Sequence, residues 1–486
     1  MHSYKIVCRK DAKTQRKCPG FQQEDSFASL RQTVFVLNLL RALTEMAAGK
    51  DGWRQIGGAW FGLLLIGIAQ AAEPVASAAL PSPLTLEQAL AFAEAAHPDL
   101  DRAQARLKAA QAGLDQAEST NGVRAFIDLT PQWVLPSLRI DDEMVNDSRA
   151  RFQLSKRLYD FGRTASLGEA ARADIAAREL TLLDTRQARR LDILARYLDV
   201  LLADLRYAVD NEAMAHQYVN FDKSRQRHRL GQISDVDLLE LEQRYQEAFI
   251  LRTRSQKRQA QSRMQLAIAL NRPDELPADL VLPRFSGNDR EAPELKALLG
   301  SVLQKNPALV ALRQETEGAR AQVAAERARR YPVLSAEGEA ARYEREFVSR
   351  DDLRATLNLR IPLWQGGEDR AAIALALARL HEQEARLRRA ELDLRQTVLD
   401  LVQDLEALKI ERTAAKLRTS YRDLYLDRSR ALYELEVKSD LGDAMTRSTE
   451  AQWLAAQVEF RLALAWARLD ALTGDLIQPS SQEPAR

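Results

Sequence analysis

Histidine and cysteine are frequent metal ligands and can act as nucleophiles, and both are rare in this chain. Both cysteines, Cys8 and Cys18, lie in the first eighteen residues, which excludes a structural zinc site or a disulfide framework in the main body. The histidines of the main body do not have the spacing of a metal site: His97, His216, His228 and His381. The G-x-S-x-G, H-E-x-x-H and Gly-rich phosphate-loop motifs are also missing from the sequence. We therefore predict that the chain is not an enzyme and has no cofactor.

Composition indicates which kind of element the chain builds. Aromatic residues make up 6% and charged residues 29% of it, and Ala, Leu, Arg, Glu and Gln dominate its middle. This balance is typical of long helices with narrow apolar seams rather than of thick globular cores. The net charge of +1 gives no bulk attraction to nucleic acid, so we predict no nucleic-acid partner.

The most apolar run in the sequence predicts a secretory signal peptide at 46–71. The run Ile56–Ala69 has about fourteen residues, fewer than the ~20 that a membrane-spanning helix needs. Lys50 and Arg54 precede the run, and the small-x-small pattern Ala69-Gln70-Ala71 follows it, as in a cleavage site.

This segment begins far from the start of the chain, which has two explanations. Either translation starts at Met46 and residues 1–45 are an upstream extension, or the chain has a cytoplasmic tail followed by an uncleaved anchor. We expect the first, with a mature chain that begins near Ala72. No cysteine lies at the cleavage point, so no lipid anchor is predicted.

The mature region contains an internal repeat. His97-Pro98 in the first half aligns with Asn306-Pro307 in the second, and Leu158–Gly162 aligns with Leu363–Gly367. The elements therefore follow in the same order in both halves: helix, two strands, long helix, returning helix. The predicted boundaries are a first repeat at 72–272, a Pro- and Gly-containing linker at 273–293, a second repeat at 294–475 and a tail at 476–486.

Two strands are predicted in each half, and they carry the clearest periodicity in the sequence. In Leu353–Leu363 the odd positions are apolar and most even positions are polar, and 125–135 alternate in the same way. Such alternation over about ten residues, ending in aromatics such as Tyr159 and Trp364, is typical of a membrane β-strand with one lipid face and one wet face. The predicted strands cover 123–135, 148–159, 332–344 and 352–363.

The alternative for these strands is a soluble antiparallel sheet that packs one face on a core. The neighbouring helices are long and polar and offer little to cover such a sheet, so we favour barrel strands. Four strands cannot close around a pore, because barrel diameter grows with strand number. Subunits must therefore pool their strands, and three chains would supply twelve.

Long helices follow each pair of strands. Those predicted at 163–230 and 368–432 would each extend roughly 100 Å, far beyond the ~30 Å core of a membrane. Their leucines step by three and four residues, as in a coiled-coil seam: Leu191, Leu194, Leu198, Leu201 and Leu205 in the first. Helices at 85–120 and 294–329 precede the strands, and returning helices at 233–270 and 441–473 complete helical hairpins over 163–270 and 368–473. A cytosolic filament or bundle would explain the seams, but the signal peptide and the strands argue against it.

Several motifs occur in the same order in both halves. His97-Pro98-Asp99-Leu100 and Asn306-Pro307-Ala308-Leu309 lie in the helices before the strands, Leu158–Arg163 and Ile361–Gly367 lead from strand to helix, and Arg229–Asp237 forms a turn. Together these motifs make the region 85–474 resemble the TolC-like outer-membrane factor family, also called outer membrane efflux proteins.

The resemblance implies a mainly α-helical fold class with a transmembrane β-barrel. A duplicated helix–strand–strand–long helix–helix unit would assemble as a homotrimer, with a twelve-stranded β-barrel in outer-membrane lipid and an α-helical barrel in the periplasm. The chain ends and the linker would form a mixed α/β equatorial belt. The resemblance further implies a passive conduit for efflux or type I secretion, with a periplasmic adaptor docked at its tip and an inner-membrane RND or ABC transporter supplying energy.

The resemblance also implies residues for a gate latch, meaning the contacts that hold the periplasmic end closed. Counted from Gly231, Asp237 matches the family's gate aspartate, Tyr433 its tyrosine and Lys438 its basic partner. A carboxylate that binds a cation and a phenol from a neighbouring subunit could hold the tip shut. The alternative is that these are ordinary solvated side chains. The predicted periplasmic tip residues are Gly231, Glu436 and Ser439, and Glu436 stands where a second glycine is expected.

The sequence departs from the family where an acidic pore ring is expected. Gly442 stands at the first acid of the ring and Met445 at the second. We expect Asp440 and Asp443 to form the ring in a shifted register, where a ring of acids would favour cations. Which acids face the pore stays open at this point.

A different class of function is a periplasmic coiled-coil adaptor or structural protein without a pore. An adaptor places its helical hairpin between soluble β domains, which lack a lipid-facing alternation. The alternation at 353–363 therefore favours the channel.

Overall fold

The computed structural model describes residues 80–135, 144–291, 293–344, 351–437 and 440–474. They all belong to one compact unit, Ala78–Arg486. Several predicted features lie outside the described residues: the extension 1–45, the signal peptide 46–71, the tail 476–486 and the site residues Lys438 and Ser439. Among the described helices, none has the length and apolarity required to cross a membrane.

The two halves repeat one order of elements. The first half has α3 (Pro98–Ser119), β1 (Val123–Thr130), β4 (Arg149–Tyr159), α4 (Arg163–Arg229) and α5 (Asp235–Ala269). The second half has α7 (Pro307–Ala328), β5 (Val333–Tyr343), β6 (Leu353–Arg360), α8 (Glu368–Glu434) and α9 (Leu441–Thr473). The helices α4 and α8 have 67 residues each, which corresponds to roughly 100 Å.

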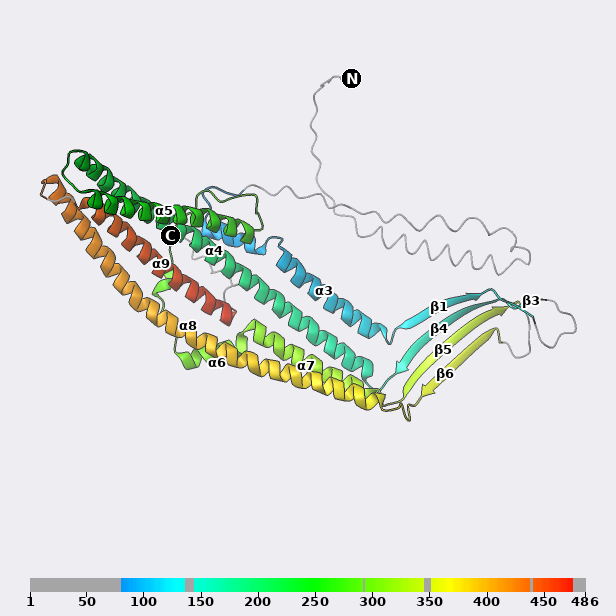
Figure 1. Cartoon of the computed structure of the whole chain (residues 1–486). Helices are drawn as coiled ribbons and strands as arrows, with labels where there is room; N and C mark the ends of the chain where they lie inside the picture. The colour runs from blue at the N-terminus through cyan, green and yellow to red at the C-terminus, as the bar shows by residue number, and fades with distance from the viewer. Residues whose placement is uncertain (1–79, 136–143, 292, 345–350, 438–439, 475–486) are drawn as a thin grey trace, which may run out of the picture. The chain divides into compact units, whose positions relative to one another are not determined.

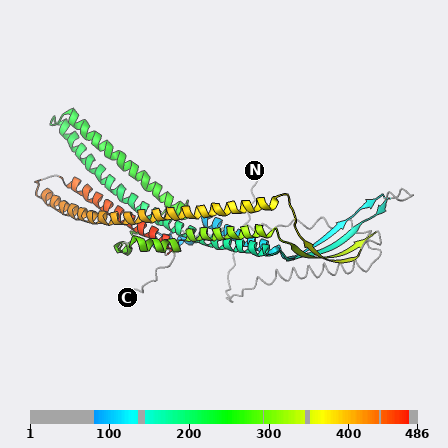
Figure 2. The same ribbon diagram turned by 90° about the horizontal axis from the view of Figure 1, so that it is seen from below.

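The strands and the helices are arranged in the same lateral order (Figure 1). The strands form one antiparallel sheet in the order β1-β4-β5-β6. Each of these strands is connected to one helix of a layer in which α3 contacts α4, α4 contacts α7, and α7 contacts α8. Further along α4 and α8 the layer continues as α5-α4-α9-α8. The long helices α4 and α8 are therefore shared by both parts of the layer, and in Figure 2 the two helical hairpins separate toward their tips.

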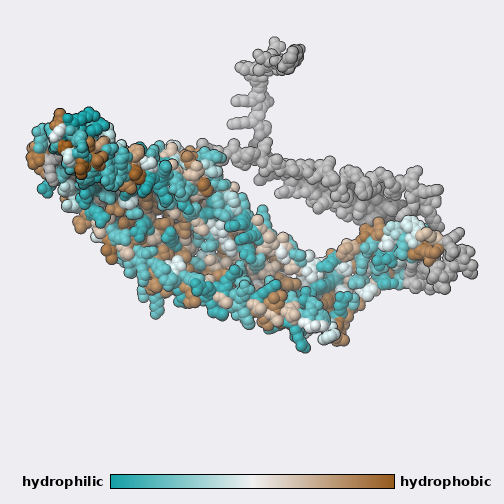
Figure 3. All heavy atoms as spheres, viewed as in Figure 1, coloured by the Kyte–Doolittle hydropathy of each residue, from teal (hydrophilic) through white to brown (hydrophobic). Residues whose placement is uncertain are grey.

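The sheet has two chemically different faces. Residues that alternate along β1 and β6, such as Ile127 and Leu357, share a face with Phe152 of β4 and Ala340 of β5, because the register pairs Ile127 with Phe152 and Phe152 with Ala340. This apolar face is exposed to the surroundings, and hydrophobic patches are visible over the strands in Figure 3. The opposite face carries most of the polar and charged residues, whereas Lys156 and Arg342 lie on the apolar face. A sheet with an exposed apolar face is what a membrane strand requires, as the sequence predicted.

The helices predicted at 85–120 and 294–329 are wrong as continuous helices, because each is broken before a proline. The first consists of α2 (Leu86–Ala91), η2 (Phe92–Glu94) and α3, and the second of α6 (Leu295–Lys305) and α7. Pro98 and Pro307 occupy the first helical position, where the missing N–H costs nothing. The preceding His97 and Asn306 cap the helices, with His97 Nδ1 accepting from the Asp99 N–H at 3.1 Å and Asn306 Oδ1 from the Leu309 N–H at 3.0 Å.

Prolines also shorten two predicted strands. The strand predicted at 123–135 ends at Thr130, before Pro131, and β2 (Trp133–Val134) pairs instead with β3 (Val145–Asn146) in a separate sheet. The strand predicted at 352–363 ends at Arg360, since Pro362 cannot donate a ladder hydrogen bond.

The largest hydrophobic core lies halfway along α4. Leu84, from the start of the described chain, pairs with Leu280 of the linker in a parallel bridge. The side chain of Tyr197 on α4 is fully buried beneath this bridge, and its Oη lies 2.9 Å from the Leu84 carbonyl oxygen and 2.7 Å from that of Val281. This region packs the start of the described chain against the linker. A second core joins α6, α8 and α9 around Val302, Leu405 and Leu462.

One side of α8 carries large apolar residues that its own chain leaves exposed. Ile410, Leu417 and Leu424 recur every seven residues and are 73%, 72% and 71% exposed. Heptad spacing places these three on one face of the helix, which is the arrangement of a coiled-coil seam. The seam lies at the edge of the α5-α4-α9-α8 layer.

Candidate gate at the tips of the helical hairpins

The first tip joins α4 to α5 through a tight turn at Gly231. Gly231 has a φ of +69°, and its N–H donates to the His228 carbonyl at 2.8 Å. The N–H of Gln232 donates to the Arg227 carbonyl at 2.9 Å, so the last carbonyls of α4 are satisfied. His228 Nε2 lies 2.6 Å from Asp235 Oδ1 and thus links the two helices across the turn.

Asp237 helps to begin α5. Its Oδ2 accepts a hydrogen bond from Ser234 Oγ at 2.8 Å, and its N–H donates to Ser234 Oγ at 3.2 Å. The Ser234 N–H completes this capping box on the same oxygen, Oδ2, at 3.4 Å. These bonds leave Oδ1 of Asp237 for a further donor, since a carboxylate can accept at both oxygens.

The second tip closes in the same way without a glycine. Glu436 adopts a φ of +58°, its N–H donates to the Tyr433 carbonyl at 3.0 Å, and the Val437 N–H donates to the Leu432 carbonyl at 3.0 Å. An L-residue in this left-handed conformation costs roughly 1–2 kcal/mol. Tyr433 lies in the last turn of α8 with its side chain exposed.

The two acids expected in the pore ring have partners in their own chain. Tyr425 Oη donates to Asp440 Oδ2 at 2.9 Å, which ties α8 to the start of α9. Arg447 Nε donates to Asp443 Oδ2 at 2.7 Å, one turn along the same helix. This hydrogen bond raises the pKa of the Arg447 guanidinium, so the Asp443 charge is compensated locally.

A contact between α4 and α9 lies beside this tip, and the sequence reasoning missed it. Gly442 of α9 faces the His216 ring, and a Cβ built on Gly442 would lie well within 3.0 Å of His216 Nδ1. The other ring nitrogen, Nε2, lies 3.1 Å from Asn220 Nδ2. Glu212, one turn before His216 on α4, accepts a hydrogen bond from Thr449 Oγ1 of α9 at 2.5 Å. In the sequence this contact is indicated only by polar residues spaced four apart along α4. That spacing does not reveal which helix these residues contact.

Within one chain the predicted latch residues do not meet. Among the described residues no hydrogen bond or ion pair joins Asp237 to Tyr433. Asp237 lies at the start of α5 and Tyr433 at the end of α8, and these two helices are the opposite edges of the α5-α4-α9-α8 layer. The two side chains could therefore come together only when another chain supplies the adjacent edge.

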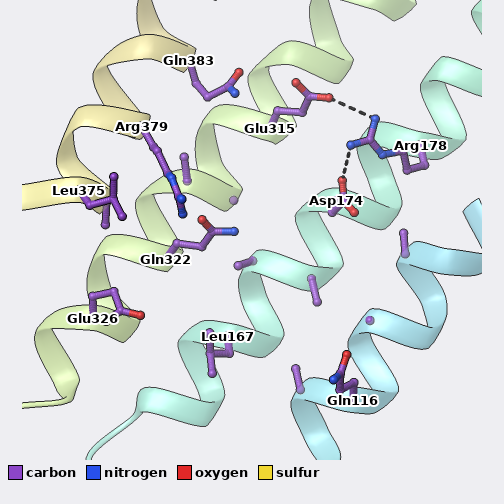
Figure 4. A pocket seen from close by; sticks show the side chains of 18 of the residues that line it. Gln116, Leu167, Asp174, Arg178, Glu315, Gln322, Glu326, Leu375, Arg379 and Gln383 are labelled. Atoms are coloured by element: carbon purple, nitrogen blue, oxygen red, sulfur yellow. Dashed lines mark ion pairs between the residues drawn. The ribbon is translucent and has the colours of Figure 1, made fainter. Parts of the chain in front are cut away.

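Nearer the strands, the helix layer has a groove of about 1540 Å³ lined by α3, α4, α7 and α8. Small residues such as Gly113, Ala170 and Gly318 form much of its floor. Figure 4 shows Arg178 between two acids, with ion-pair distances of 3.0 Å to Asp174 and 3.5 Å to Glu315. Four helices line this groove.

Comparisons with known proteins agree with this architecture. Residues 298–475, most of the second repeat, match the family model described as "Outer membrane efflux protein". Protein CyaE of Bordetella pertussis is 27% identical to the chain over 329 residues, which are 65% of this chain and 69% of that protein.

Solved structures share the fold. The CmeC outer membrane channel of Campylobacter jejuni has a TM-score of 0.68 at 13% identity, over 80% of this chain and 86% of that one. The outer membrane protein VceC of Vibrio cholerae has a TM-score of 0.66 at 18% identity, over 80% of this chain and 96% of that one. With the motifs and the duplicated helix–strand unit, these findings show that residues 298–475 match the outer membrane efflux protein family and that the chain shares the fold of solved outer-membrane proteins.

Proposed function

We propose that three copies of this chain form a passive outer-membrane channel whose helical part crosses the periplasm in a tripartite export system. One observation carries the proposal: the strand layer and the helix layer have the same order, and both end in edges that the chain does not cover. A closed tube removes such edges, and three chains would give twelve strands and twelve helices in cross-section.

The chemistry of the strand edges supports closure in a membrane. The outer strands β1 and β6 carry exposed apolar residues such as Leu129 and Leu353 and have unpaired backbone groups on one side. In lipid, unpaired backbone groups cost several kcal/mol each, so a membrane sheet must close on itself. Pairing β6 of one chain with β1 of the next would satisfy these groups and keep the apolar face toward lipid.

The helix edges support the same assembly. The exposed heptad seam of α8, formed by Ile410, Leu417 and Leu424, needs an apolar partner helix. The opposite edge helix, α5, exposes Val236, Leu239 and Ile250. Packing α8 of one chain against α5 of the next would cover both surfaces and would bring Tyr433 near Asp237 of the neighbour.

This assembly gives the tip residues their proposed roles. Asp237, Tyr433 and Lys438 would form the latch between chains, with Asp237 Oδ1 as the acceptor. Asp440 and Asp443 would lie near the narrow end, and Gly231, Glu436 and Ser439 would form the surface on which a periplasmic adaptor docks. An inner-membrane transporter of the RND or ABC class would supply the energy.

Reconstitution in planar lipid bilayers tests the proposal. The mature chain should migrate as a trimer in mild detergent and should insert as a channel of discrete conductance. A monomer that stays soluble without detergent would contradict the barrel and would favour the adaptor or structural alternative.

A further inference from the structure

The polar and apolar faces of the strand sheet differ in how exposed their side chains are. On β4 the apolar side chains Phe152, Leu154 and Leu158 are exposed, whereas Arg151 and Arg157 on the other face are half-buried. The sheet therefore curls around its polar face, which would line the lumen of the proposed barrel.

Arginines dominate this polar face. Alternation and register place nine charged residues on it within the four described strands: Arg124, Arg149, Arg151, Arg157, Arg354, Arg360, Asp128, Glu337 and Glu339. Six guanidinium groups against three carboxylates give a net charge of +3 per chain, although the whole chain has a net charge of only +1. The positive charge is thus concentrated where the lumen would be.

Three of these arginines lie together at the end of the sheet nearest the helices. Arg124 opposes Ser155, Arg157 opposes Ser335, and Arg360 opposes Val333. We call Arg124, Arg157 and Arg360 the basic collar. Three chains would arrange nine guanidinium groups around the junction between the β-barrel and the helical tube.

Most of the collar charge is not neutralised within the chain. Arg157 Nη1 lies 3.6 Å from Asp160 Oδ2, but that oxygen also accepts from the Thr164 N–H at 3.0 Å, and Asp160 is buried. Arg124 and Arg360 are exposed, and neither forms an ion pair with any described residue. Exposed guanidinium groups without carboxylate partners can bind carboxylates or phosphates of a passing solute, often in a bidentate manner.

We propose that the basic collar is an anion-binding constriction of the lumen that recognises solutes rich in carboxylate or phosphate groups. The inference rests on the proposed function, because the collar exists as a ring only in the closed trimer. The basic collar would make the barrel end of the lumen prefer anions. This preference is opposite to the cation preference expected for Asp440 and Asp443 at the other end. The lumen would thus present two charge filters in series.

Block of single channels from the barrel side tests the collar. Short oligoglutamate and oligolysine peptides of equal length are added to that side in turn, so that the probe reaches the barrel before the tip. Oligoglutamate should interrupt the current of the unmodified channel, and oligolysine should not. In Arg124→Gln/Arg360→Gln the oligoglutamate concentration for half block should rise roughly tenfold, because six of the nine collar charges are removed.

Arg342→Gln is the matched control, since Arg342 opposes Ala150 and lies on the apolar face. It removes the same charge type from the sheet and should leave the block unchanged. Conducting trimers that oligoglutamate does not block, or that it blocks equally in the collar variant, would overturn the inference while the proposed function stands. Failure of the unmodified chain to form any conducting trimer would overturn the proposed function, and the collar with it.

Discussion

The imidazole of His216 occupies the space that a side chain on Gly442 would need. A Cβ at that position would lie well within 3.0 Å of His216 Nδ1, closer than real Cβ atoms approach a neighbour. Gly442 therefore permits the start of α9 to lie directly against α4. This contact joins the two helical hairpins near the second tip, so a movement of α9 there would also move α4.

Gly442→Ala should weaken the contact between the hairpins. The added methyl group would displace the His216 ring and break its hydrogen bond to Asn220, and overpacking of this kind costs about 1–3 kcal/mol. We expect a lower melting temperature of the detergent-solubilised trimer and a larger closed-state conductance.

Two variants separate this clash from a general effect of alanine. Gly300→Ala adds a methyl group in α6, where nothing lies within 4 Å, and should be neutral or slightly stabilising. The double variant His216→Ala/Gly442→Ala should recover most of the stability lost by Gly442→Ala. If the double variant recovers nothing, the His216 ring is not the cause.

The two tips should respond in opposite ways to glycine exchange. Glu436 holds a φ of +58° without a glycine, so Glu436→Gly should stabilise the second tip by about 1 kcal/mol. Gly231 holds a φ of +69°, so Gly231→Ala should destabilise the first tip by a similar amount. Hydrogen exchange at the flanking amides measures each tip separately, and changes of the same sign in both variants would contradict the argument.

Tyr197 should make the trimer sensitive to alkaline pH. Burial raises the pKa of its phenol from 10.0 to about 12. Because the folded state holds the proton more tightly, this contribution to stability is complete below pH 10 and is lost as the pH rises toward 12. Thermal melts across this pH range should show a falling melting temperature, and the fall should be less steep in Tyr197→Phe.

Tyr197→Phe should also lower the free energy of unfolding by about 1 kcal/mol at neutral pH, because it removes the hydrogen bonding between Oη and the carbonyl oxygens of Leu84 and Val281. Tyr421→Phe serves as the control, since the Tyr421 side chain is exposed. Tyr421→Phe should lose stability at alkaline pH to the same extent as the unmodified trimer. Equal alkaline slopes for Tyr197→Phe and the unmodified trimer would assign the loss to other groups.

Periodicity predicted the strands well because their two faces meet different surroundings. A lipid face and a wet face require period-two alternation, so the pattern placed β4 and β5 within one residue of their observed ends. Three prolines, Pro98, Pro307 and Pro131, interrupt elements that the periodicity alone would continue. The rule that proline begins helices and interrupts strands was available from the sequence.

The gate could be predicted only in part, because its geometry depends on helix crossing. Counting from Gly231 selected Asp237 and Tyr433 as latch candidates, which stays a prediction, and it revealed neither the capping role of Asp237 nor the edge positions of both helices. The approach of His216 to Gly442 joins residues of different repeats, and it depends on the angle between α4 and α9. Neither the periodicity nor the motif spacing determines the angle between these two helices.

The latch between chains should control the closed state. Asp237→Ala combined with Tyr433→Phe removes a carboxylate acceptor and a phenol donor. Each such link would stabilise the closed state by roughly 0.5–3 kcal/mol. The closed-state conductance in planar bilayers should therefore rise severalfold. Because Asp237 also caps α5, Ser234→Ala is the control: it weakens the cap by about 1 kcal/mol but keeps the carboxylate, and conductance should not change. In a Cys8→Ser/Cys18→Ser background, Asp237→Cys with Tyr433→Cys should form disulfide-linked oligomers, whereas either cysteine alone should not. Unchanged conductance in the double variant, or an equal rise in Ser234→Ala, would show that the tip is held by other contacts.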